Sequence, residues 1–346
     1  MPVRTGAQGA GRTAAPAGET ERLRGAGGRS AAAPDCVILQ AMAARIDFEY
    51  LRSIAASDSD RLVLERISGD RETLLAGERL DSAVEYLRLS LYAPDAPDTT
   101  DTADGADTAD GAEAAPGNSR PLELVLRSDL APASLDTFLE IFRDRAHTRV
   151  EGFCGESGGT VVDLGANEGY YALRMKRLNP ALRVIAAEPV VENVDLLQRN
   201  LEANGVGSTV AVQTAVVSAQ RLTNGGKVRL ETYPHVGTIA STDIRAFPRP
   251  WIRSSRIEAR AVPGTTLARL LDENEVDGAE LLKMDIEGSE AEILPAEPET
   301  FRRFRRVVVE CHGVQARERC REVLTGQGFT CVHEEGKRSG DLYFVR

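Results

Sequence analysis

Two acidic residues that end neighbouring apolar segments have types and spacing that could bind a nucleoside. Asp163 ends the apolar run 160–164 and begins a D-x-G-x-x-x-G pattern with Gly165 and Gly169. Glu188 ends the next apolar run, nineteen residues after Gly169. A carboxylate at that second position can accept both hydrogen bonds of a ribose diol. The pair therefore predicts a ligand with a ribose, held where two strands end.

The glycine spacing separates this ligand from a dinucleotide. A dinucleotide-binding turn reads G-x-G-x-x-G, and its amides and helix N-terminus face a pyrophosphate. Here the third glycine spacing is missing, and the carboxylate of Asp163 would repel a pyrophosphate. That carboxylate suits an ammonium group, which S-adenosylmethionine carries near its sulfonium. The alternative is that Gly165 and Gly169 only permit a tight turn and close helix packing.

We therefore expect S-adenosylmethionine as the cofactor. The predicted cofactor-binding residues are Asp163, Gly165, Ala166, Asn167, Gly169, Glu188 and Asn193. Asn193 is included because it falls in the first turn of the helix after Glu188, where it could contact the adenosine. Polar residues on a helix more often cap it or face solvent, and this is the alternative for Asn193.

A second acidic constellation follows in the segment LKMDIEGSE at residues 282–290. Successive side chains of a strand point to opposite faces, so Lys283 and Asp285 should share one face of this strand. Its carboxyl end should border the same cleft as Asp163. Asp285 is a candidate general base, substrate anchor or metal ligand, and helix capping by the acid cluster is the alternative.

Glu310 and His312 end the next strand on a shared face. His312 could be a general base, or a strand-end histidine with one hydrogen bond.

The predicted catalytic residues are thus Asp285 and His312, and no metal site is predicted. The five cysteines include no C-x-x-C pair, which excludes a zinc site of that kind and a disulfide framework. No other spacing is strong enough to indicate a metal, although Asp285, Glu310 and His312 could converge on one.

These motifs require an α/β domain to position them. After Arg120 apolar strands alternate with helical stretches, which is typical of a mainly parallel sheet. The pattern predicts strands at 160–164, 183–188, about 210–214, 280–285, 306–311, 329–333 and 341–345, helices at 170–178, 191–204, 265–274, 289–294 and 315–326, and a hairpin within the polar excursion 219–262.

The chain before this domain divides into three stretches. Residues 1–35 are rich in Ala, Gly and Arg and predict a disordered tail. Residues 36–92 follow a helical pattern that includes Leu87 and Leu89. Residues 93–119 hold seven acids and no Lys or Arg, which predicts an acidic low-complexity linker, with a receptor-binding role as the alternative. The catalytic domain is predicted over 120–346.

Charge and hydropathy narrow the possible partners. The net charge is -11, and without the seven acids of the linker it would be -11 + 7 = -4, so the rest of the chain is nearly balanced. This balance argues against a broad nucleic-acid surface. No apolar stretch approaches a membrane span, and the first 35 residues lack the apolar region of a signal peptide. We expect no nucleic-acid or membrane partner and a cytoplasmic location, and nothing in the sequence indicates an oligomeric state.

In this order and spacing, the segments VVDLGANEGYYAL, AAEPVVENVDLLQRN and KMDIEGSEAEIL resemble the FkbM family of S-adenosylmethionine-dependent methyltransferases. The resemblance covers roughly residues 138–346, and its third segment is the most diagnostic. It implies a Rossmann-like class I fold: a mostly parallel seven-stranded sheet with helices on both faces, preceded here by a small N-terminal helical region. The family's cofactor residues carry over onto Asp163, Gly165, Gly169 and Glu188, and its strand-end acid onto Asp285. Glu287 and Glu290 match with less defined roles.

The resemblance further implies methyl transfer, usually to a hydroxyl oxygen. The predicted function is O-methylation of a natural product, sugar or other metabolite, so the expected partner is a small or sugar-like acceptor. One alternative is an N- or carboxyl-methyltransferase acting on a peptide or protein. Another is a non-catalytic metabolite-binding or scaffold module, against which the intact Asp163, Gly165, Gly169 and Glu188 argue. A nicotinamide oxidoreductase is disfavoured by the missing third glycine.

Overall fold

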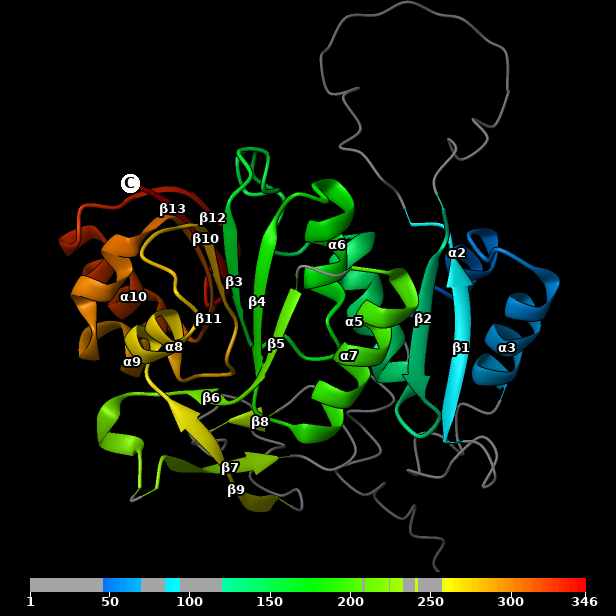
Figure 1. Cartoon of the computed structure of the whole chain (residues 1–346). Helices are drawn as coiled ribbons and strands as arrows, with labels where there is room; N and C mark the ends of the chain where they lie inside the picture. The colour runs from blue at the N-terminus through cyan, green and yellow to red at the C-terminus, as the bar shows by residue number, and fades with distance from the viewer. Residues whose placement is uncertain are drawn as a thin grey trace, which may run out of the picture. The chain divides into compact units, whose positions relative to one another are not determined.

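A seven-stranded sheet, in the order β12-β13-β11-β10-β3-β4-β5, carries all the predicted motifs (Figure 1). The computed structural model describes residues 46–69, 85–93, 120–206, 209–223, 225–232, 240–241 and 257–346. The strands are β3 (Thr160–Leu164), β4 (Arg183–Glu188), β5 (Thr209–Gln213), β10 (Ala279–Met284), β11 (Phe304–His312), β12 (Thr330–Glu334) and β13 (Ser339–Val345). Pairs from β5 to β11 are parallel, and β13 is antiparallel to both neighbours. The predicted mostly parallel sheet is confirmed.

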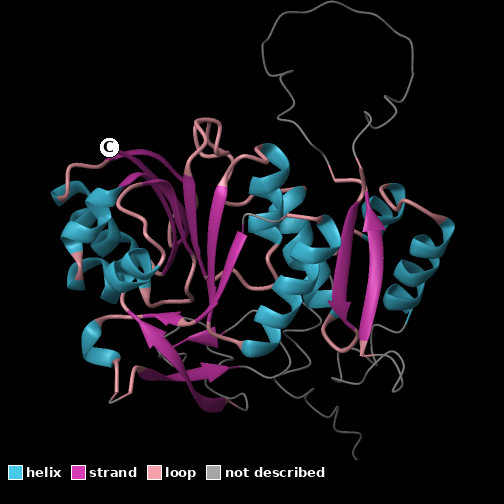
Figure 2. Ribbon diagram, viewed as in Figure 1, coloured by secondary structure: helices cyan, strands magenta, loops and turns pink. Residues whose placement is uncertain are grey.

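Helices cover both faces of this sheet (Figure 2). One face packs against α5 (Ala131–Phe142), α6 (Tyr170–Leu178) and α7 (Val191–Asn204), and the other against α8 (Leu267–Glu273), α9 (Glu290–Ala296), the 3-10 helix η4 (Pro298–Arg303) and α10 (Val314–Gly326). Alternate strand residues enter the two cores, so Val161 lies in the first and Val162 in the second. Because both faces are buried, the central strands β3 and β4 are almost continuous apolar runs, which is typical of parallel sheets.

The chain order creates a switch point between β3 and β10. From β3 the chain moves outward through β4 to β5, and later returns to β10 and moves the other way to β11. The carboxyl ends of strands flanking such a point border the crevice where open α/β sheets bind ligands. Asp163, Glu188 and Asp285 all come from strand ends at this point.

The polar excursion forms a smaller sheet of its own. Its strands are β6 (Ala215–Val216), β7 (Lys227–Thr232), β8 (Ala240–Ser241) and β9 (Glu258–Thr265), and a short 3-10 helix η1 (Ala219–Arg221) follows β6. Strand β7 pairs antiparallel with β9, which confirms that the excursion doubles back on itself. Residues 233–239 and 242–256 of the excursion lie outside the described residues.

The N-terminal region is helical only in part. It contains α2 (Phe48–Ser53) and α3 (Asp58–Gly69), but Leu87 and Leu89, predicted in the helical pattern, lie in a strand, β1 (Tyr86–Leu91). Strand β1 pairs antiparallel with β2 (Leu122–Arg127), and Leu89 and Leu91 are fully buried. The alternation of leucines at 87, 89 and 91 is the strand period, which a count of leucines alone overlooks.

The pair β1–β2 packs beside α7 (Figure 1). Asn200 of α7 is fully buried, and its Oδ1 accepts a hydrogen bond from the backbone N of Val125 at 2.7 Å. The tail predicted at 1–35 lies outside the described residues, and so does all but the first residue of the linker predicted at 93–119. None of the helices in the described ranges combines the length and apolar character that a bilayer span needs.

Candidate active site

The turn after β3 is possible only because glycines stand at two of its positions. Gly165 has φ +78°, and a Cβ there would lie 1.8 Å from the backbone O of Asp285. Gly169 has φ +86°, and a Cβ there would lie 3.1 Å from Cγ of Leu197. The close packing that was named as the alternative reason for the two glycines is therefore present: Gly165 lies against the chain after β10, and Gly169 lies against Leu197 of α7. The backbone N of Ala166 extends this close packing by donating to O of Ala187 at 3.1 Å.

Glu188 is held in place from the same turn. Its Oε2 accepts from the backbone N of Asn167 at 3.0 Å, and its Oε1 accepts from the backbone N of Val190 at 2.9 Å. The side chain of Asn193 also donates to Oε1 at 3.3 Å. Asn193 is only 3% exposed, so it orients Glu188 instead of facing solvent. Burial raises the pKa of Glu188 to about 7, against the lowering effect of these hydrogen bonds.

Asp163 is fully buried and forms an ion pair with Lys283, whose Nζ lies 3.1 Å from its Oδ1. The two residues are register neighbours on β3 and β10. Lys283 also donates to the backbone O of Gly165 at 2.9 Å. Burial alone would lower the pKa of Lys283, but the charges of Asp163 and Asp285 raise it, so Lys283 stays charged. Sequence reasoning placed Lys283 beside Asp285 and missed its partnership with Asp163.

Two acceptor atoms around the turn are buried without a hydrogen bond in the described part of the chain. They are Oδ2 of Asp163, which is not the oxygen 3.1 Å from Lys283, and Oδ1 of Asn167. A buried acceptor left without a donor costs about 1–3 kcal/mol, so such atoms indicate a ligand with donor groups. An ammonium and a nucleoside supply donors, so the residues present fit the cofactor predicted from the sequence.

Asp285 belongs to an acidic group next to the turn. Its side chain is 25% exposed, and its Oδ2 lies 3.8 Å from Lys283 Nζ and 3.8 Å from Nε2 of His147. His147 is buried, and its backbone N and Nδ1 both bond to Asp341 at 3.0 Å. Burial lowers the pKa of His147, but the charge and hydrogen bond of Asp341 together with the charge of Asp285 raise it to about 9. No sequence signal pointed to His147, which has φ 63° in an irregular segment.

His312 lies among three carboxylates at the end of β11. Its nitrogens are 3.4 Å from Glu287, 3.5 Å from Glu290 and 3.5 Å from Glu310. Burial lowers the pKa of His312, but the hydrogen bond and charge of Glu290 and the charges of Glu287 and Glu310 raise it well above its ordinary value. His312 is therefore an imidazolium in this arrangement. The shared strand face predicted for Glu310 and His312 is confirmed.

The loop between β10 and α9 is held by Glu290. This side chain is fully buried, and its Oε1 accepts from the backbone N of Ile286 at 3.0 Å and of Gly288 at 3.3 Å. Capping of backbone N–H groups, which was the alternative role for the acid cluster, is therefore the role of Glu290. Asp285 accepts no such backbone hydrogen bond in the described structure. The ligand atoms of Asp285, Glu290 and His312 lie within 4.8 Å of one another, so both predicted catalytic residues meet at one place.

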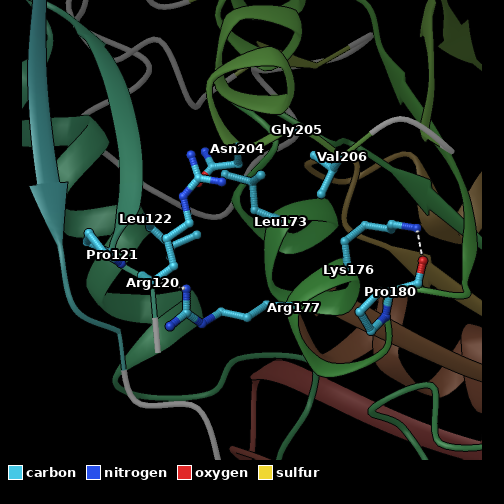
Figure 3. Close-up of a pocket in the computed structure, with 10 residues that line it drawn as sticks. All are labelled: Arg120, Pro121, Leu122, Leu173, Lys176, Arg177, Pro180, Asn204, Gly205 and Val206. Carbon is cyan, nitrogen blue, oxygen red and sulfur yellow. Dashed lines mark hydrogen bonds between the residues drawn. The ribbon is translucent and has the colours of Figure 1, made fainter. Parts of the chain in front are cut away.

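A separate pocket lies at the far ends of α6 and α7 (Figure 3). Arg120, Arg177 and Gly205 line it. Lys176 also lines it and donates to the backbone O of Pro180, which closes the loop after α6. Gly169 caps the opposite end of the nine-residue helix α6, about 13 Å away at 1.5 Å per residue. This pocket is therefore distinct from the crevice at the strand ends.

Comparison with known proteins agrees with this geometry. Residues 163–331 match the model of the methyltransferase FkbM domain. Methyltransferase sdnD of Sordaria araneosa is 27% identical over 207 residues, which are 53% of this chain and 78% of that protein. The 31-O-demethyl-FK506 methyltransferase FkbM of Streptomyces tacrolimicus is 28% identical over 225 residues, which are 57% of this chain and 82% of that protein.

Among solved structures, Aeropyrum pernix fibrillarin in complex with natively bound S-adenosyl-L-methionine aligns with 54% of this chain and 66% of its own, at a TM-score of 0.34 and 11% identity. The matched region begins at Asp163 and includes Glu188, Asp285 and His312, which lie at the ends of three strands of the sheet. At residues 163–331 the chain carries a methyltransferase domain of the FkbM family.

Proposed function

We propose that this methyltransferase uses S-adenosylmethionine to methylate a hydroxyl oxygen of a natural product, sugar or other metabolite. The observation that supports it best is the turn after β3, beside Glu188, where Oδ2 of Asp163 and Oδ1 of Asn167 are buried without a donor. When bound, S-adenosylmethionine supplies an electrophilic methyl group on its sulfonium. The name of the Streptomyces relative states an O-methyl acceptor on a natural product, and this supports the same acceptor class here.

Each residue of the turn has a distinct part in holding the cofactor. Glu188 would accept from the ribose hydroxyls, and Asn193 keeps its carboxylate oriented. Asp163 and Asn167 would accept from the donor groups of the cofactor, because Oδ2 of Asp163 and Oδ1 of Asn167 are buried without a hydrogen bond. The small residues Gly165, Ala166 and Gly169 keep the turn close to the chain after β10, to β4 and to α7, respectively.

Asp285 is the group that we assign to the acceptor. Among the acids of the site it stands next to the turn, and a quarter of its side chain is exposed. It would hold the acceptor hydroxyl and receive its proton. His312 is protonated in the free protein, so we assign it to holding Glu287 and Glu310, and it becomes a base only after losing its proton. Orientation of two reactants can lower a barrier by about 7–11 kcal/mol, so positioning is the larger part of the task.

Calorimetric titration tests the cofactor, and product analysis tests the acceptor. We expect heat with S-adenosylmethionine and with its demethylated product, and no heat at high micromolar ligand would overturn the proposal. A panel of hydroxylated metabolites is then incubated with cofactor, and fragment masses locate the added methyl on oxygen or nitrogen. A nitrogen or carboxylate product would contradict the acceptor class.

The variant Asp285→Asn tests whether this residue acts on the acceptor and not on the cofactor. Turnover should fall by about 10²–10⁴-fold, the usual contribution of a positioned proton acceptor, while affinity for S-adenosylmethionine changes by less than about threefold. Asp163→Asn is the matched change on the cofactor side, and it should weaken cofactor affinity. Full turnover in Asp285→Asn would contradict its assignment.

A further inference from the structure

His147 is presented to the acidic group by a second residue that fixes its ring. Asp341 accepts from both the backbone N and Nδ1 of His147, so Nδ1 carries the hydrogen and Nε2 is the atom that faces Asp285. A carboxylate behind the far nitrogen of a histidine is the usual way in which proteins orient an imidazole toward a metal ion. The ring is 4% exposed, so this orientation is locked by burial.

Glu310 completes a three-residue group with His147 and Asp285. One ligand atom from each of the three lies within 4.8 Å of the others. Ligand atoms bound at about 2.1 Å to one ion lie about 3–3.5 Å apart, so small side-chain rotations would bring the three into contact with it. The donors come from three separate parts of the chain, which is why no short spacing in the sequence reveals them.

The charges around this group are unbalanced. Six carboxylates lie here against three cationic side chains; the carboxylates are Asp163, Asp285, Glu287, Glu290, Glu310 and Asp341, and the cations are His147, Lys283 and His312. Glu310 and Asp341 are also direct register partners on β11 and β13. Like charges opposed across a strand pair destabilise it, and a bound cation would relieve this repulsion.

A rival group, Asp285 with Glu290 and His312, shares one residue with the group of His147, Asp285 and Glu310. Glu290 in that group already binds two backbone N–H groups, and His312 is enclosed by three carboxylates. The group with His147 has its orienting partner behind it and its nitrogen toward Asp285, so it is the better site.

We propose that His147, Asp285 and Glu310 bind a divalent cation that accepts both imidazole and carboxylate ligands, such as Mn²⁺. Three protein ligands leave coordination positions for oxygen atoms of another molecule. If the protein methylates a hydroxyl as proposed above, the ion would bind that hydroxyl and lower its pKa, so that its proton would pass more readily to the carboxylate oxygen of Asp285 that does not bind the ion. Only this last role rests on the proposed function.

Metal binding is measured on the full chain after chelator treatment, without cofactor or acceptor. Mn²⁺ is titrated and followed by loss of the free-ion signal in electron paramagnetic resonance and by calorimetry. We expect one Mn²⁺ per chain. Affinity should fall at least tenfold in Glu310→Gln and in His147→Gln, and about 10–100-fold in Asp341→Asn, which touches the ring and not the ion.

His333→Gln is the matched control, because His333 is half exposed and lies 3.9 Å from Glu335. Its affinity should equal that of the wild type, and circular dichroism checks that every variant is folded. Absence of Mn²⁺ binding in the wild type would overturn the proposal, and so would equal affinity in Glu310→Gln. Loss of binding in His312→Gln with retention in His147→Gln would place the ion at the rival group and also overturn it.

The cofactor titration distinguishes this inference from the proposed function. If S-adenosylmethionine binds while Mn²⁺ does not, only the metal site is wrong. If Mn²⁺ binds while S-adenosylmethionine does not, the metal site stands and the methyl donor is wrong.

Discussion

Gly165 is the residue where a single added carbon has the largest consequence. A Cβ there would overlap the backbone O of Asp285 at 1.8 Å, and backbone cannot move away as a side-chain end can. Gly165→Ala should therefore separate the turn from β10, reduce the free energy of unfolding by more than about 2 kcal/mol and abolish cofactor binding. Urea unfolding and calorimetry measure the two effects.

Gly205→Ala is the control for the backbone conformation alone. Gly205 also has positive φ, +66°, but a Cβ there meets nothing within 4 Å. The left-handed conformation alone should cost about 1–2 kcal/mol and leave cofactor affinity unchanged. Equal effects in the two variants would show that the close approach at Gly165 is unimportant.

Because of the Glu188 carboxyl, the affinity for the cofactor and the free energy of unfolding should change in opposite directions with pH. Its pKa is raised to about 7, so below that value one oxygen carries a proton and no longer accepts from a ribose hydroxyl. Affinity for S-adenosylmethionine should fall as the pH drops through 7. The unfolded chain binds this proton only near about pH 4.3, so the free energy of unfolding of the ligand-free protein should rise as the pH drops from about 8 to 5.

Glu188→Gln should remove both trends at once, because the amide does not titrate in this range. The quantity to compare is therefore the difference between wild type and variant at each pH, measured by calorimetry and by urea unfolding. The same pH dependence in both proteins would mean that other groups control it.

The residues of the site differ in how far sequence can predict them. Asp163, Glu188 and Asp285 each lie in or directly after the last two residues of an apolar strand, so a local pattern places them at one edge of a sheet. His147 has no such pattern, and its partner Asp341 lies 194 positions away. The pairing of Lys283 with Asp163 also depends on β10 lying next to β3, and that strand order is a tertiary property.

At the scale of elements, the strand β1 was missed because its partner lies beyond the acidic stretch. Its leucines follow directly after apolar residues that were assigned to helices and were grouped with them. Their alternation becomes clear only from the pairing of β1 with β2. The strands β3 and β4 and the helices α6 and α7 were predicted with their observed bounds. Those elements are bounded by glycine, proline or a polar strand end, so their limits are local.

The strand β1 should contribute to the stability of the whole fold. Leu89 is fully buried in the core shared with α5, α6 and α7. Leu89→Ala should lower the free energy of unfolding by about 2–5 kcal/mol. Leu62→Ala is the matched control: Leu62 is 65% exposed, so its replacement should change stability by less than about 0.5 kcal/mol. Equal, small effects in urea unfolding would mean that β1 does not form part of the cooperative unit.

At the scale of the whole molecule, seven of the eleven net negative charges belong to one connection. Leu91 and Leu122 are register partners, so residues 92–121 join two strands whose ends are adjacent. Six residues would be enough to make this connection, and deletion of residues 95–118 leaves that number. The deletion also removes all seven acids of the stretch and changes the net charge from -11 to -4.

If the acidic stretch is the solvated linker that its composition predicts, its length lowers the free energy of unfolding only through the entropy of closing the loop. Closing a loop of about 30 residues costs about 1.4 kcal/mol more than closing one of about six, so the deletion should raise the free energy of unfolding by about 1 kcal/mol. Turnover on a small acceptor should be unchanged, because Asp163, Glu188 and Asp285 come from other segments. Lower stability would show instead that the stretch packs on the domain. Unchanged stability with lost turnover would favour the alternative, in which the stretch recruits a partner or substrate.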